Sequence, residues 1–129
     1  MPGSPEFPRA LSEREAEILT LMLDMDDPRF QALRNQASTA SVIGRCPCGC
    51  ATIDLQVDRS SGAAVSLPSP ASETWARSNP TDPDSFFELI LFLDAGWLSS
   101  LEIVYYGQTV PTEFPPASDF QKPTLRPSS

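Results

Sequence analysis

The strongest structural signal in this chain is a run of apolar residues followed by a turn and an alternating segment. Residues 86–93 are almost continuously aliphatic or aromatic, which is typical of a strand that is buried on both faces. Turn-forming residues follow at Asp94-Ala95-Gly96. Residues 98–106 then alternate between apolar and polar side chains, as a half-buried strand does. We therefore predict a β-hairpin whose first strand lies in the centre of a sheet.

Two helices are predicted ahead of this hairpin. Ser12 and Glu15 have the spacing of a capping box, and apolar residues then recur at helical spacing over residues 12–25. Asp27 is the predicted N-cap of a second helix over residues 28–37, which has proline at its first position. The apolar stripe of the first helix is broad, so we expect it to pack against a sheet.

The remaining segments are predicted to be strands, a loop and a tail. The residue pattern predicts two strands around a tight turn, over residues 41–46 and 50–57. It also predicts a short third strand over residues 63–67. Residues 68–85 contain four prolines and many Ser, Thr and Asp residues, which predicts a long loop. The end of the chain, residues 117–129, is rich in proline and is predicted to be a flexible tail.

The chain has 129 residues, the length of one domain, and a net charge of −8. We place this domain at residues 8–116 and interpret residues 1–7 as a cloning remnant, with Phe114 and Phe120 anchoring the chain after the sheet. No apolar run is long enough to span a membrane, so we expect a cytoplasmic location without membrane contact. The negative charge opposes binding to nucleic acid and suits a basic protein partner.

The chain contains no histidine. This absence excludes Ser-His-Asp and Cys-His nucleophilic sites, histidine-ligated zinc and the commonest general base near neutral pH. Glycine-rich phosphate-binding motifs are missing as well. An enzyme that uses carboxylates such as Asp54 and Glu102 is the weakest alternative, because no spacing among them fixes an acid and a base. We therefore expect a protein that is not an enzyme and that needs no cofactor other than a metal ion.

All three cysteines lie in the sequence Cys46-Pro47-Cys48-Gly49-Cys50. Proline at the first loop position and glycine at the third predict a three-residue hairpin loop. The first and last cysteines would then face each other with their Cβ atoms about 5 Å apart. Three interpretations stay open: reduced thiols in a structural turn, a metal site, and a redox-active thiol pair.

The metal interpretation uses Cys46, Cys48 and Cys50 as ligands. Thiolates select soft ions, which predicts zinc or copper. A closed zinc site has four ligands, so Asp54, a water molecule or a second chain would have to complete it.

The run Cys-x-Cys-Gly-Cys-x-Thr-Ile at residues 46–53, followed by Leu-x-x-Leu-Glu-Ile at residues 98–103, resembles short uncharacterised bacterial proteins with a Cys-x-Cys-Gly-Cys hairpin. The resemblance covers about residues 11–116. It implies no known activity and identifies no functional residue.

These features predict an α+β fold, with two N-terminal helices packed on one face of a mainly antiparallel sheet of four or five strands, ordered as a meander. The helices can cover only one face of that sheet. Either the Pro-rich tail or a partner covers the other face, and Ile90 and Phe92 there, together with Trp75, form the predicted partner surface. The leading hypothesis is a non-catalytic protein-binding or regulatory module, and the alternative is a thiolate metal-binding protein.

Overall fold

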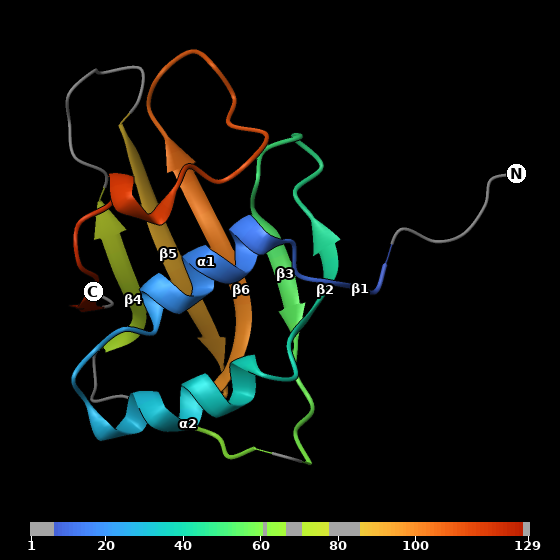
Figure 1. Ribbon diagram of the computed structural model, residues 1–129, viewed down its shortest axis with the longest axis vertical. Coiled ribbons are helices and arrows are strands. Elements are labelled where there is room, and N and C mark those ends of the chain that lie inside the picture. Colours follow the sequence, from blue (N-terminus) through green and yellow to red (C-terminus); the bar gives the residue numbers. More distant parts are fainter. Residues whose placement is uncertain (1–6, 61, 67–70, 78–85, 128–129) are drawn as a thin grey trace, which may run out of the picture.

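A computed structural model describes residues 7–60, 62–66, 71–77 and 86–127 of the chain. Figure 1 shows a single twisted sheet with α1 crossing in front of it and α2 along its lower end. In chain order the elements are β1 Arg9–Ala10, α1 Glu13–Met22, α2 Pro28–Ala37, β2 Ser41–Arg45, β3 Ile53–Gln56, β4 Ala71–Arg77, β5 Phe87–Asp94, β6 Trp97–Tyr105, the 3-10 helix η2 Ala117–Asp119 and β7 Thr124–Pro127.

Both predicted helices form, and each has the predicted N-cap. In α1 the Ser12 Oγ accepts a hydrogen bond from the Glu15 backbone N–H at 3.1 Å, and the Glu15 carboxylate accepts one from the Ser12 N–H at 2.9 Å. In α2 the Asp27 carboxylate accepts a hydrogen bond from the Arg29 N–H at 2.9 Å. These bonds satisfy backbone donors that have no partner inside the helix, so the two helix starts are fixed locally.

The seven strands of the described residues form one sheet in the order β1-β2-β3-β6-β5-β4-β7, and their pairings are antiparallel. The five inner strands agree with the predicted four or five, and the short strands β1 and β7 extend the sheet at its edges. Helix α1 contacts β4 and β5, and α2 contacts β6. The predicted α+β class, with two helices on an antiparallel sheet, is confirmed.

The strand order departs from the predicted meander at two junctions, where β3 pairs with β6 and where β4 pairs with β7. Strands β1, β2 and β3 are neighbours in sequence order, and so are β4, β5 and β6, but β3 pairs with β6. In the centre of the sheet, Leu101 of β6 therefore pairs with Leu91 of β5 on one side and with Ile53 of β3 on the other. The apolar pattern of a strand determines which of its faces is buried, but it does not determine which strands pair with it. The strand order therefore could not be predicted from that pattern.

Strand β4 lies inside the segment that the sequence predicts as a loop. The prediction over residues 68–85 is wrong for residues 71–77, which pair with β5, and the rest of that segment lies outside the described residues. Trp75 becomes the register partner of Ile90. A central strand needs hydrogen-bond partners along both edges, and this requirement outweighs the polar composition of the segment.

The turn of the central hairpin forms as predicted. Ala95 and Gly96 have φ angles of 52° and 89°, which is the positive-φ pair that a two-residue hairpin turn uses. The short strand predicted at residues 63–67 does not form over residues 63–66. Instead the Val65 N–H donates a hydrogen bond to the Gly96 carbonyl at 2.9 Å, which ties this segment to the hairpin turn.

The core lies between the sheet and a second layer made by the helices and the end of the chain. Phe114 and Phe120 belong to this core and are 2% and 7% exposed. Between them η2 contacts α1, and beyond them β7 pairs with β4. The domain therefore continues past residue 116, where the sequence predicts a flexible tail. Burial of two large aromatic side chains in the core holds this segment in place despite its high proline content.

Candidate metal centre

The three cysteines lie in a loop that joins β2 to β3 at one end of the sheet (Figure 1). The Cys46 N–H donates to the Thr52 carbonyl at 3.1 Å, which closes the loop. The Gly49 N–H donates to the Cys46 carbonyl, also at 3.1 Å, and so forms a β-turn with Pro47 at its second position. Gly49 has a φ angle of 91°, which a residue without a Cβ adopts readily.

The loop is longer than the predicted three-residue hairpin loop. Strand β3 begins at Ile53 instead of residue 50, so Cys46 pairs with Thr52 and does not face Cys50 across the hairpin. The additional residues turn Cys50 into the core, where it is 4% exposed. A free cysteine behaves as a small apolar side chain. Burial of Cys50 therefore favours this inward turn over an extension of the β2–β3 hydrogen bonds to residue 50.

The three sulfur atoms nevertheless converge. All three Sγ atoms lie within 4.8 Å of one another. Those of Cys46 and Cys48 are 2.7 Å apart, and the Cys50 backbone N–H donates to the Cys48 Sγ at 3.4 Å. Exposure is graded, since Cys48 is exposed, Cys46 is half-buried and Cys50 is buried. The residues that the sequence predicts as metal ligands are therefore within reach of one ion.

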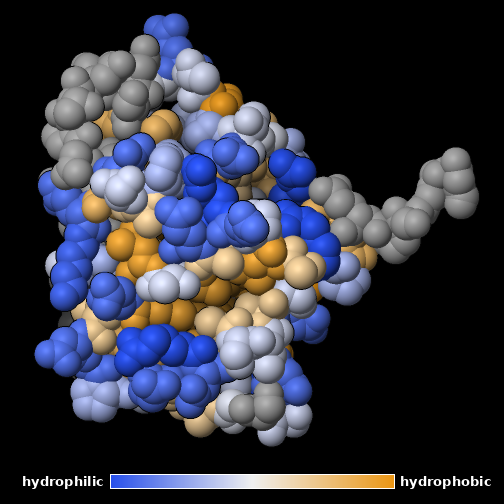
Figure 2. Space-filling model, in the orientation of Figure 1, coloured by the Kyte–Doolittle hydropathy of each residue, from blue (hydrophilic) through white to orange (hydrophobic). Residues whose placement is uncertain are grey.

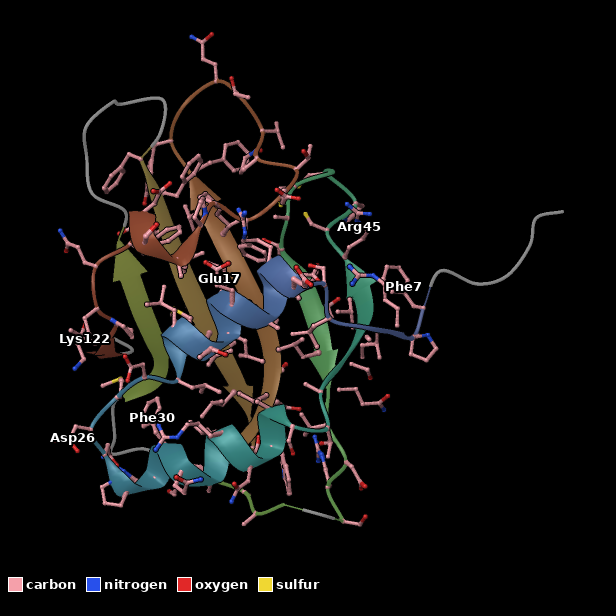
Figure 3. The ribbon with its side chains drawn as sticks, viewed as in Figure 1. Phe7, Glu17, Asp26, Phe30, Arg45 and Lys122 are labelled. Carbon is pink, nitrogen blue, oxygen red and sulfur yellow. The ribbon has the colours of Figure 1, made fainter. Side chains whose placement is uncertain are left out.

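Among the described residues no carboxylate joins the sulfur cluster. Asp54, the predicted fourth ligand, lies on β3 opposite Gly44 of β2. Its Oδ2 occupies the space beside Gly44, 2.9 Å from where a Cβ would be. Arg45, at the β2 end of the loop, is exposed (Figure 3). A metal ion in this loop would have three protein ligands, all sulfur, and an open side next to Cys48.

The residues predicted as a partner surface lie on two adjacent strands. Trp75 of β4 pairs with Ile90 of β5, and Phe92 follows two residues along β5. Ile90 is 7% exposed and lies outside the core cluster between the sheet and the helices, while Phe92 is half-buried. The structure brings these backbone positions together, but Ile90 itself offers little surface to a partner.

An apolar groove between α1 and α2 was not identified from the sequence. It has a volume of about 390 Å³ and is lined mainly by small and aliphatic side chains, among them Ala16, Leu19, Leu23, Ala37 and Ala40. Figure 2 shows apolar side chains gathered between the hydrophilic surfaces of the two helices. The alanines could have indicated this groove from the sequence, because small residues on two neighbouring helices leave space between them.

A second hollow, of about 670 Å³, adjoins the groove and shares Thr20 and Arg34 with it. Its lining is mainly charged and includes Glu17 and Asp26 as well as Lys122 (Figure 3). The groove is therefore apolar along its floor and charged at one end, with more acidic than basic residues there.

Comparisons with protein-family models, with curated proteins and with solved structures give no match for this chain. Within the described residues, no helix has both the length and the apolar character that crossing a membrane requires.

Proposed function

We propose that this protein binds one soft metal ion through Cys46, Cys48 and Cys50. The observation that carries the proposal is the convergence of the three Sγ atoms, which lie within 4.8 Å of one another. Thiolates are the protein ligands that zinc and copper(I) prefer. The Cys50 N–H that donates to the Cys48 sulfur supplies the outer hydrogen bond that commonly supports a metal thiolate.

The sulfur spacing is tighter than a loaded site requires. With a Zn–S distance of about 2.3 Å and tetrahedral angles, two sulfur ligands lie about 3.8 Å apart. The Cys46–Cys48 distance of 2.7 Å must therefore increase by about 1 Å when an ion binds. Cys48 is exposed, so its side chain can move to another rotamer without disturbing the core.

The number of ligands favours copper(I) over zinc. Three thiolates complete the coordination of copper(I), whereas zinc in a structural site takes four ligands. A water molecule or a group from a second chain would have to supply the fourth ligand of zinc. We therefore expect the reduced protein to retain copper(I) in the presence of a competing chelator that removes zinc.

Metal analysis of the reduced protein tests this function. We expect about one copper(I) ion per chain for the wild type and less than about 0.1 for the variant with all three cysteines replaced by serine, since thiolate sites hold their ions tightly. Asp54→Asn is the matched control, and it should keep the wild-type stoichiometry. Equal metal content in the wild type and the triple variant would refute the proposal.

The groove between α1 and α2 supports a second function, the binding of a basic amphipathic helix from another protein. Such a helix places its apolar face in a groove and its charged face toward the rim. The floor here is apolar, Glu17 and Asp26 lie at one end, and the whole chain has a net charge of −8. Charge complementarity therefore selects a basic partner.

A fluorescent synthetic helix of leucine and lysine is a suitable probe for the groove. We expect it to bind the wild type and to lose binding to Ala16→Trp, which fills the groove, while Gln31→Trp on the exposed side of α2 leaves binding unchanged. A scrambled peptide of the same composition separates the two contributions, because it keeps the charge and loses the apolar face. Equal binding of both peptides would show that the groove takes no part.

A further inference from the structure

We infer that Cys46 and Cys48 also form a redox-active dithiol that exchanges with low-molecular-weight disulfides of the glutathione type. Cys48 is the attacking thiol, Cys46 is the resolving thiol, and Cys50 stays reduced. The inference does not require a bound metal ion. Only its consequence for metal binding rests on the proposed function.

The graded exposure of the three side chains assigns these roles. A disulfide substrate must approach the attacking sulfur in line, so that sulfur has to be accessible. Cys48 is exposed at the tip of the loop and meets this condition. Cys50 is 4% exposed within the core cluster, and a molecule the size of a glutathione disulfide cannot reach it.

The distances select Cys46 as the resolving thiol. Its Sγ lies 2.7 Å from the Cys48 Sγ, about 0.7 Å longer than the disulfide bond of about 2.05 Å. Formation of the Cys46–Cys48 disulfide therefore requires a smaller movement of the two sulfur atoms than the increase of about 1 Å that a metal ion requires. The turn maintains this proximity, because Pro47 has a restricted φ and the Gly49 N–H donates to the Cys46 carbonyl at 3.1 Å.

The exchange proceeds in two balanced steps. The Cys48 thiolate attacks one sulfur of the disulfide, a Cys48–glutathione bond forms, and one glutathione thiolate leaves with the electron pair of the broken S–S bond. The Cys46 thiolate then attacks Cys48 Sγ and releases the second glutathione thiolate. The protein loses two electrons and the two thiol protons, and one glutathione disulfide is reduced to two glutathiones.

The resulting bond would be easy to reduce again. A disulfide stabilises a fold more when it closes a longer loop, and this one spans two residues separated by a single proline. It therefore adds little to the stability of the fold, which is typical of a regulatory or catalytic disulfide and not of a structural one. Oxidation would also remove two of the three proposed metal ligands, so disulfide formation and metal binding exclude each other.

Oxidation of the metal-free, reduced protein by glutathione disulfide tests the assignment. By intact mass and peptide mapping, we expect the wild type to form the Cys46–Cys48 disulfide without retaining glutathione, while Cys50 still reacts with an alkylating agent after unfolding. Cys46→Ser should retain one glutathione on Cys48. Cys48→Ser should lose the exchange.

Two replacements of the buried cysteine, Cys50→Ser and Cys50→Ala, serve as controls. Either of them, if folded by circular dichroism, should react as the wild type does. Glutathione on Cys50, a wild-type disulfide that includes Cys50, or loss of exchange in a folded Cys50 variant would overturn the inference.

Metal binding by the oxidised protein separates this inference from the proposed function. Metal-free protein that glutathione disulfide has oxidised to the Cys46–Cys48 disulfide should retain less than about 0.1 copper(I) ion per chain, and reduction of the disulfide should restore about one. Exchange without any metal binding would leave the dithiol in place and refute the metal site alone. Metal binding without exchange would refute the dithiol alone.

Discussion

The side-chain amide of Gln36 donates a hydrogen bond to the Gly96 carbonyl at 2.9 Å, which joins α2 to the turn of the central hairpin. The same amide nitrogen donates to the Ala63 carbonyl at 2.7 Å, and the Gln36 Oε1 accepts from the Leu98 N–H at 2.9 Å. Gln36 is 1% exposed. One buried side chain therefore satisfies three backbone groups from two segments that are far from it in the sequence.

Replacing Gln36 with leucine should lower the free energy of unfolding by about 3 kcal/mol, because each buried polar group left without a partner costs about 1–3 kcal/mol. Gln31→Leu, on the exposed side of the same helix, should change it by less than about 0.5 kcal/mol. Urea unfolding of both variants measures the difference. Similar stabilities for the two would mean that the Gln36 bonds are replaced by water.

Alanine substitutions at Gly96 and Gly49 should separate the cost of a steric clash from the cost of a positive φ angle in a residue that has a Cβ. Their φ angles are nearly equal, 89° and 91°. A Cβ at Gly96 would lie 2.6 Å from the Val65 carbonyl oxygen, whereas one at Gly49 would have no neighbour within 4 Å. We expect Gly49→Ala to cost about 1 kcal/mol from the positive φ alone. Gly96→Ala should cost at least about 2 kcal/mol more because the backbone must also move. Thermal unfolding of both variants checks the order, which equal losses would contradict.

The pKa of Asp27 should report the ion pair at the start of α2. Hydrogen bonds from the Arg29 side chain, and then from the Arg29 backbone N–H, lower the pKa of Asp27 from its ordinary value of 3.8 to about 2. A depressed pKa favours the folded state above pH 3.8, and that contribution is lost as the pH falls through about 2. In Arg29→Gln the pKa should rise but stay below 3.8, because the backbone bond remains. Carboxyl-carbon NMR titration measures it, and an unchanged pKa would exclude the ion pair.

Phe120→Ala should show that the end of the chain belongs to the domain. Phe120 is 7% exposed in the core, and truncating a buried phenylalanine costs about 3–5 kcal/mol. The exposed Val110 provides a control, since Val110→Ala should cost less than about 0.5 kcal/mol. Chemical denaturation compares the two, and a loss at Phe120 no larger than that at Val110 would place the end of the chain outside the cooperative unit.

The sequence predicts well the elements whose signals are local. The Ser12 and Asp27 caps and the Ala95-Gly96 turn use residue types that satisfy nearby backbone groups or adopt positive φ without help from distant parts of the chain. The cysteine cluster is also local, because three sulfurs within five residues of a turn cannot lie far apart.

Tertiary structure decided which segments became neighbours. Strand β4 formed from a polar segment because β5 required a second partner, and β3 paired with β6 through contacts distant in sequence. Packing also turned Cys50 inward and left a groove beside Ala16 and Ala37. Local patterns determine which backbone conformations and which buried faces are available. The choice among partners depends on the total surface buried and on the hydrogen bonds satisfied across the whole chain, which no short segment encodes.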